Sequence, residues 1–180
     1  MNVFHDFVPS EVLISIGPIK VYWYGLIMVS AMMVGLGVAK SLAARFKIGV
    51  ELIYDLGFWL IIWGLAGARL YDVLLEWSYY SQNLGDILKI WQGGLAIHGA
   101  VIAGLMVVII FALRHKLSFW TLAGVVVPGL VIGQAIGRWG NYFNQELFGR
   151  PTDLPWGIFI DELHRPLNYA SYSYFQPTFF

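Results

Sequence analysis

The stretch GLAIHGAVIAGLMVVIIFAL, residues 94–113, decides the fold because it is strongly apolar and contains no Asp, Glu, Lys or Arg. A helix needs roughly 20 apolar residues to cross a hydrocarbon core of about 30 Å. Three further long apolar stretches lie at about residues 21–39, 55–75 and 119–137. Only a helix pairs all of its backbone polar groups within one such stretch. The sequence therefore predicts an all-α, polytopic helical membrane protein with about four transmembrane helices.

Composition supports a membrane location and excludes several classes of protein. Of the 180 residues, 58% are hydrophobic and only 12% are charged, which is too apolar for a soluble domain. The net charge is zero, so we expect no nucleic-acid partner. The chain has no cysteine, which excludes disulfides and a cysteine nucleophile of its own. The four histidines lack the spacing of metal ligands, so we expect neither a metal nor a cofactor.

Basic residues in the loops predict the orientation in the membrane. The loop between the second and third stretches carries Glu76, Asp86 and a single basic residue, Lys89. Cytoplasmic loops are enriched in Lys and Arg, so we expect this loop and the N-terminus outside. Residues from Arg138 onward are also expected outside, as an ordered extracytoplasmic loop region rich in Gly, Pro and aromatic residues. The two basic loops expected inside contain Lys40, Arg45 and Lys47, and Arg114 and Lys116.

The chain has the organisation of one domain. Its loops are short and no internal repeat is evident, so residues 1–180 are expected to form a single membrane-embedded domain. Gly129, Gly133 and Gly137 recur every four residues in the fourth stretch, which predicts close packing against another helix. Residues 1–10 lack the basic segment and apolar core of a cleaved signal peptide, so we expect the first stretch to be retained.

Polar side chains gather near the expected outer ends of the four helices. Such residues are costly in a membrane and usually face a cavity or a partner. Arg69 either pairs with Asp72, which follows one helical turn later, or binds a phosphate. His98 lies among small residues and is either a functional group or a buried structural histidine. From its spacing alone, Tyr24 is better explained as an interfacial aromatic residue. The set consists of Tyr24, Arg69, Asp72, His98 and Arg138.

The densest polar run is GRWGNYFNQELFGR, residues 137–150. An arginine beside amide side chains at a membrane surface suits an anionic phosphate, because its planar fork binds two oxygens at once. Asn141, Asn144 and Glu146 are also residue types that cap helices and turn the chain. A structural role for these three residues therefore stays open at this point.

In this run the chain resembles the prolipoprotein diacylglyceryl transferase family. Residues 137–149 are similar to the family signature of glycine, arginine, any residue, glycine or alanine, asparagine, aromatic, any residue, asparagine, any residue, glutamate, two of any, glycine. YWYG at 22–25, GAR at 67–69 and GLAIHG at 94–99 also resemble family segments, in the same order. FQPTFF at 175–180 resembles the start of a segment that continues into further helices in the family, so we expect a C-terminally truncated chain. Gly124 and Gln176 depart from the aspartate and histidine expected there.

The resemblance implies a transferase of the bacterial cytoplasmic (inner) membrane whose active site faces outward. Members of the family move the diacylglyceryl group of phosphatidylglycerol to the lipobox cysteine of a prolipoprotein signal peptide. The reaction forms a thioether and releases glycerol phosphate. Its thiolate nucleophile benefits from a nearby base or cation, and its phosphodiester leaving group benefits from fixed hydrogen-bond donors. The alternative function is a transporter of lipids or small solutes, although the apolar midplane and the lack of repeats argue against it.

The resemblance also implies roles for single residues. His98 is the candidate base, and Tyr24 is its hydrogen-bond partner or an alternative proton acceptor. Arg138 is expected to bind the phosphate, with Asn141 as a neutral donor and Glu146 orienting either the loop or Arg138. Arg69 and Asn144 complete the set of residues expected to bind substrate.

Overall fold

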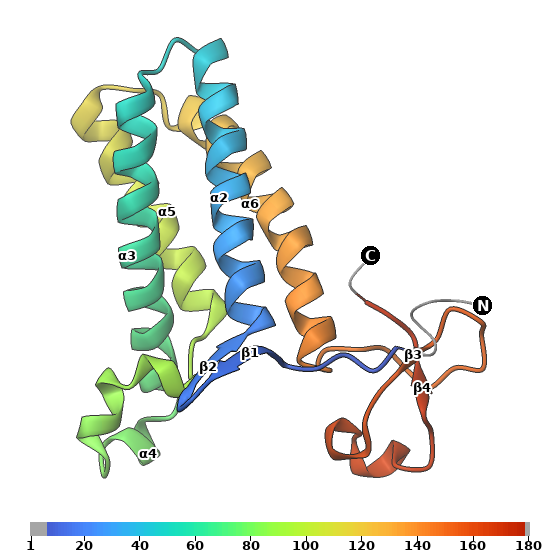
Figure 1. Ribbon diagram of the computed structural model, residues 1–180. Coiled ribbons are helices and arrows are strands. Elements are labelled where there is room, and N and C mark those ends of the chain that lie inside the picture. Colours follow the sequence, from blue (N-terminus) through green and yellow to red (C-terminus); the bar gives the residue numbers. More distant parts are fainter. Residues whose placement is uncertain (1–6, 179–180) are drawn as a thin grey trace. The chain divides into compact units, whose positions relative to one another are not determined.

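The computed structural model describes residues 7–178, and its long elements are four helices. All four are long and apolar enough to cross a membrane, which confirms the predicted helical membrane protein (Figure 1). Residues 1–6, 179 and 180 lie outside the described residues, and with them parts of two sequence segments discussed above. The four helices are α2 (Trp23–Arg45), α3 (Val50–Leu75), α5 (Ile97–His115) and α6 (Phe119–Phe143).

The helices extend beyond the apolar stretches because a helix does not stop where the hydrocarbon does. α2 continues from residue 39 to Arg45, and α3 begins at Val50 instead of residue 55. α6 runs on to Phe143, so Arg138 lies within a helix and not in the loop region where we expected it. α5 begins at Ile97, later than expected, because Gly93 and Gly94 have φ values of 93° and 72°, which no right-handed helix contains.

The chain forms two compact units. The first contains the described residues up to Gly35 and from Gly129 onward, and the second contains Leu36–Pro128. Both boundaries fall inside helices, one in α2 and the other in α6. The organisation of residues 1–180 as a single membrane-embedded domain stays a prediction.

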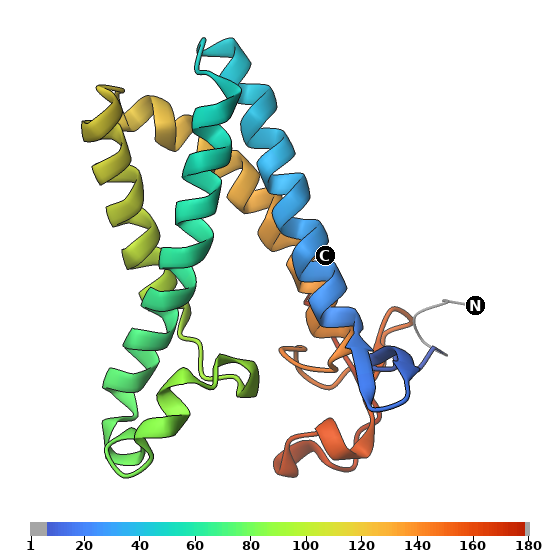
Figure 2. The ribbon, with the colours of Figure 1, turned by 60° about the vertical axis from the view of Figure 1, so that its left-hand side comes forward.

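The second unit is built on the close packing of α3 against α5 (Figure 2). Their backbones meet at Gly67 and Gly99, where a Cβ on Gly67 would lie 2.7 Å from the Gly99 carbonyl oxygen. Three short helices connect α3 to α5: α4 (Trp77–Tyr80), η1 (Leu84–Leu88) and η2 (Ile90–Gln92). The buried core of the second unit is apolar and includes Ala43, Leu56, Phe111, Leu122 and Val125.

The first unit contains two small antiparallel sheets that the sequence did not predict. β1 (Val12–Ile16) pairs with β2 (Ile19–Tyr22) in a hairpin whose turn contains Gly17 at φ 59°. β3 (Ile158–Phe159) pairs with β4 (Tyr174–Phe175), and the short helices η3 (Glu162–His164) and η4 (Leu167–Tyr169) lie between them in sequence. Tyr142, Ile158, Ile160 and Phe175 form the buried core of this loop region.

The glycine stripe of α6 packs against the first half of α2, which confirms the sequence prediction. A Cβ on Gly35 would lie only 2.9 Å from the Gly129 carbonyl oxygen, so the two backbones touch at this point. One turn further along α6, a Cβ on Gly133 would lie 3.4 Å from the carbonyl oxygen of Ala31. The stripe continues to Gly140 and so brings the start of α2 close to the end of α6.

Candidate functional site

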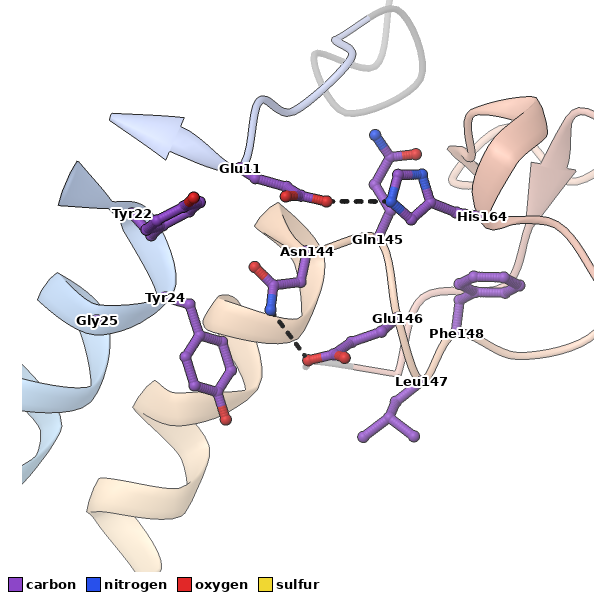
Figure 3. A pocket seen from close by; sticks show the side chains of 10 residues that line it. All are labelled: Glu11, Tyr22, Tyr24, Gly25, Asn144, Gln145, Glu146, Leu147, Phe148 and His164. Atoms are coloured by element: carbon purple, nitrogen blue, oxygen red, sulfur yellow. Dashed lines mark hydrogen bonds and ion pairs between the residues drawn. The ribbon is translucent and has the colours of Figure 1, made fainter. Parts of the chain in front are cut away.

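An open pocket of about 810 Å³ lies in the first unit, beside the start of α2 and the end of α6 (Figure 3). Three of the expected site residues line it: Tyr24, Asn144 and Glu146. The sequence predicted no site role for the other residues of the wall. These include Glu11, Tyr22, Gln145, Phe148 and His164. The structure therefore groups residues from the first expected helix and from the polar run around one pocket.

The end of α6 has the geometry of a Schellman motif, in which two nested backbone hydrogen bonds (6→1 and 5→2) close the final turn. The Glu146 amide donates to the Asn141 carbonyl oxygen (2.9 Å), and the Gln145 amide donates to that of Tyr142 (3.1 Å). Gln145 occupies the left-handed position at φ 50°. This motif brings the side chains before and after the turn together, where many helices place an apolar contact. Here Asn141 and Asn144 both donate to Glu146 Oε1, at 2.9 and 3.4 Å.

Gly140 determines where the Tyr24 ring can lie. A Cβ at position 140 would come within 2.8 Å of Tyr24 Cδ2, so glycine lets the ring lie directly against α6. Tyr24 is half-buried in the first turn of α2, and its side chain lines the pocket together with those of Asn144 and Glu146 (Figure 3). The packing of a glycine against an aromatic ring thus fixes one of the expected reacting groups.

Arg138 lies about one and a half turns before the end of α6 and is exposed. Its side chain is about 100° around the helix from Gly137 and about 160° from Gly140, so it leaves α6 on a face other than the glycine stripe. Within residues 7–178, no hydrogen bond or ion pair engages its guanidinium group. Glu146 therefore orients the loop through the two amides, while the donors of Arg138 stay available for an anion.

Gln145 is one of the pocket residues for which the sequence predicted no role. Its side chain is buried, with Nε2 donating to the Pro9 carbonyl oxygen (3.2 Å) and Oε1 accepting from the Asp161 amide (2.6 Å). It thereby joins the N-terminal segment, the end of α6 and the loop before η3. The family signature allows any residue here, so the motif gave no signal. Across the pocket, His164 Nε2 lies 3.1 Å from Glu11 Oε1.

In the second unit, Arg69 is buried and binds the backbone of the segment that leads into α5. Nε donates to the Ile87 carbonyl oxygen (2.9 Å), Nη1 to those of Gly93 (2.7 Å) and Gly94 (2.8 Å), and Nη2 to that of Asp86. Asp72 Oδ2 lies 3.7 Å from Nη1, so the pairing with Asp72 is present but is a minor part of the arrangement. The role of Arg69 in substrate binding stays a prediction.

The connection after α3 is held by three further side chains. Tyr80 donates to Asp72 Oδ2 (3.0 Å), and burial together with this hydrogen bond raises the pKa of Tyr80. The hydrogen bond from Lys89 Nζ (2.6 Å), followed by that from Tyr79 (2.6 Å), lowers the pKa of Asp86. At neutral pH, Tyr79 and Tyr80 are therefore neutral donors and Asp86 is a carboxylate.

His98 is the second residue of α5, and its side chain is exposed and not buried. The imidazole ring stacks on Tyr71 of α3, with ring centroids 5.9 Å apart and planes inclined by 29°. No hydrogen bond to the ring is found within the described part of its unit. Both nitrogens are thus available, as a general base requires. No group of three His, Asp or Glu side chains able to hold a metal occurs among residues 7–178.

Comparison with known proteins identifies the family. The family model for prolipoprotein diacylglyceryl transferase matches residues 11–180. The chain belongs to this family. A relative from Trichormus variabilis is 49% identical over 95% of the chain, and one from a Nostoc species is 48% identical over the same share. Both relatives are named phosphatidylglycerol--prolipoprotein diacylglyceryl transferase, as is a Synechocystis protein that is 47% identical over 95% of the chain. The chain spans 60 to 61% of the length of these three relatives.

One of the two departures from the prolipoprotein diacylglyceryl transferase pattern lies against the signature itself. The Gly149 amide donates to the Gln176 carbonyl oxygen (2.7 Å), and a Cβ at position 149 would lie 2.9 Å from Gln176 Cβ. The last glycine of the signature is therefore required by the close approach of residue 176. Because this contact runs through the backbone and Cβ, glutamine maintains it as well as the expected histidine would.

Proposed function

We propose that the protein containing this chain transfers the diacylglyceryl group of phosphatidylglycerol to the lipobox cysteine of a prolipoprotein, the first step of bacterial lipoprotein maturation. The cysteine sulfur forms a bond to a glyceryl carbon while the bond from that carbon to the phosphate oxygen breaks. Glycerol phosphate leaves with the electron pair, and the thiol proton passes to a base. The observation that carries the proposal is the cluster of Asn141, Asn144 and Glu146 at the end of α6, in which Asn144 and Glu146 line a pocket together with Tyr24.

The proposed role of Arg138 is to bind the phosphate of phosphatidylglycerol. Its guanidinium group presents several N–H donors in a fixed plane, and none of them is engaged within residues 7–178. Negative charge grows on the phosphate oxygen as the bond to carbon breaks, and preorganised donors stabilise that charge. Asn141 has a second amide N–H beyond the one given to Glu146 and can add a neutral hydrogen bond.

The proposed role of His98 is to accept the thiol proton. A free thiol has a pKa of about 8.5, so a base at neutral pH increases the fraction of the reactive thiolate. The exposed imidazole, with no hydrogen-bond partner in its unit, supports this assignment. Tyr24 is the alternative proton acceptor or a hydrogen-bond partner in the same step, supported by its place on the pocket wall. Asn144, also on that wall, is proposed to contact the substrate.

The proposed location is the bacterial cytoplasmic membrane, with the reaction on its outer face. The argument rests on charge: Lys40, Arg45 and Lys47 follow α2 or end it, and Arg114 and Lys116 lie between α5 and α6. The connection between α3 and α5 carries far less positive charge. The positive-inside rule then places the pocket end of α6 and the start of α5 toward the outside, where a prolipoprotein presents its lipobox.

Mass spectrometry of a lipobox peptide tests the proposal. The peptide is incubated with phosphatidylglycerol and membrane-embedded protein, using both this chain and a version joined to the remaining C-terminal segment of the Trichormus variabilis relative. We expect a diacylglyceryl mass gain on the cysteine with release of glycerol phosphate. Arg138→Ala should reduce turnover by ~100-fold or more, as loss of a fixed donor to a developing charge does.

Arg150→Ala is the matched control, because Arg150 is also an exposed arginine of the first unit. It should retain turnover within ~3-fold of the parent, as expected for a surface charge outside the site. Correct membrane insertion with no adduct from either version would reject the transferase proposal. Near-normal turnover of Arg138→Ala would reject the phosphate-binding role alone.

A further inference from the structure

We infer that Arg69 is a positioning residue. It anchors the segment before α5 and thereby fixes the position of His98, the second residue of α5, against α3. The inference rests on the proposed function for what His98 does there. Arg69 uses its donors on backbone carbonyl groups of residues 86, 87, 93 and 94, and only 7% of the residue is exposed. A guanidinium group has five N–H donors, and at least four are engaged, so a phosphate would have to displace backbone partners.

Three consecutive residues of α3 hold three successive points of the segment that contains His98. Arg69 binds the carbonyl groups of Gly93 and Gly94, as described above. The Ala68 carbonyl oxygen accepts from the Ala96 amide (3.1 Å), immediately before α5 begins. Gly67 meets Gly99 backbone to backbone at the first turn of α5. The GAR segment and the GLAIHG segment are thus the two sides of one joint.

Gly94 is essential to this joint for two physical reasons. Its φ of 72° is unfavourable for any residue with a Cβ. A Cβ there would also lie 2.6 Å from Asp72 Oδ2 and 2.9 Å from the Tyr80 hydroxyl oxygen. Glycine therefore lets the chain pass close enough for its carbonyl group to reach the guanidinium. The same guanidinium group lies over the Tyr80 ring, with Arg69 Cζ 5.0 Å from the ring centroid.

The joint determines where the imidazole of His98 lies. His98 is between Ala96 and Gly99, both of which are fixed to α3, and its ring stacks on Tyr71, which follows Arg69 by two residues. A general base must stay within hydrogen-bonding reach of its proton, and a displacement of about 1 Å can cost ~100-fold in rate. Loosening the segment would therefore reduce turnover without removing any group that touches the substrate.

Arg69→Lys tests the inference, because lysine keeps the positive charge and loses the planar fork. The protein is the extended chain used above, and hydrogen exchange of residues 94–99 is measured together with kcat and KM for phosphatidylglycerol. We expect exchange to accelerate by ~10-fold or more and kcat to fall by ~10-fold, with KM changed by less than ~3-fold. Gly94→Ala keeps Arg69 and should change the exchange rate, kcat and KM in the same way. This second variant tests the inference if Arg69→Lys does not fold.

Two controls lie in the same connection. Lys89→Gln removes the ion pair with Asp86, and Gly85→Ala adds a Cβ in open space. Both should leave kcat and the exchange of residues 94–99 unchanged. A higher KM for Arg69→Lys with unchanged exchange would overturn the inference and make Arg69 a phosphate ligand, and faster exchange with unchanged kcat would overturn it as well. If the parent protein transfers nothing, the proposed function fails, and the exchange of the Arg69→Lys and Gly94→Ala variants still decides whether the anchor exists.

Discussion

Asn141 Nδ2 donates to Glu146 Oε1 at 2.9 Å across the end of α6. The two residues occupy the positions that a Schellman motif brings together, and here the usual apolar contact is replaced by an amide and a carboxylate. The same backbone geometry that ends the helix therefore also builds the polar wall of the pocket. The spacing of asparagine and glutamate in the family signature has a direct physical reason in this turn.

Glu146→Gln separates the charge of this side chain from its hydrogen bonds. A glutamine carbonyl oxygen can still accept from Asn141 and Asn144, so we expect turnover within ~3-fold of the parent and an unfolding free energy within about 0.5 kcal/mol. Glu146→Ala removes the oxygen that accepts both hydrogen bonds and should lower the unfolding free energy by about 0.5–1.5 kcal/mol. Denaturant unfolding in detergent and the peptide assay measure both. Equal loss of turnover in the two variants would show that the carboxylate charge itself takes part.

Gln145 and Lys47 both occupy left-handed positions after helices, at φ 50° and 58°, but only Gln145 is buried with its side chain bonded to two distant segments. Gln145→Ala should therefore destabilise the protein by about 1–3 kcal/mol, because the Asp161 amide loses its partner. Lys47→Gly should instead stabilise it by about 0.5–1 kcal/mol by relieving the left-handed backbone. Thermal unfolding of the two variants gives the comparison. A stabilising Gln145→Ala would show that these hydrogen bonds contribute nothing net.

Gly99→Ala tests the joint between α3 and α5 by steric means. A Cβ on Gly99 would lie 2.8 Å from the Gly67 carbonyl carbon, and a rigid backbone cannot yield cheaply. We expect a loss of about 1–3 kcal/mol in unfolding free energy, the usual cost of overpacking. Gly104→Ala in the same helix is the control, since its Cβ would meet Leu60 Cδ2 at an ordinary 3.7 Å. Equal stability of the two variants would mean that the helices separate without cost.

Hydropathy and length predicted the four helices because both follow from the thickness of a membrane, which does not depend on tertiary contacts. The helix ends were less predictable, since they are set by local hydrogen bonds and by left-handed residues such as Lys47 and Lys116. That is why Arg138, assigned to a loop from the sequence, lies within α6. The two small antiparallel sheets were missed because their strands are short and give little periodic signal.

The candidate site was predictable only where residue type alone indicates chemistry. Tyr24, Asn144 and Glu146 were singled out, and all three line the pocket. Gln145 was not, because its partners Pro9 and Asp161 are far away in the chain and its own position in the signature is variable. Spacing suggested Asp72 as the partner of Arg69. Its principal partners proved to be backbone carbonyl groups, which no sequence pattern shows.

The remaining prediction concerns Gly124, where an aspartate was expected. A Cβ at position 124 would meet nothing within 4 Å, so there is room for a larger side chain at this position. Gly124 lies five residues after Phe119, the first residue of α6, and about four helical turns before Arg138. It is therefore close to the N-terminal end of this helix. A carboxylate this close to a helix end can reach the membrane surface at low cost, whereas one at the midplane costs ~2.5–3.5 kcal/mol.

We therefore expect Gly124→Asp to insert normally, to unfold with a free energy within about 1 kcal/mol of the parent and to keep turnover within ~3-fold. Gly133→Asp is the contrasting variant, because a Cβ at this position would lie only 3.4 Å from the Ala31 carbonyl oxygen in the packed glycine stripe. Its carboxylate would face a backbone oxygen in a closely packed interface, so it should destabilise the protein by about 2 kcal/mol or more. Unfolding in detergent and the lipobox-peptide assay compare the two. A rise in turnover of ~10-fold or more for Gly124→Asp at unchanged stability would show that position 124 takes part in the reaction and that glycine there limits it.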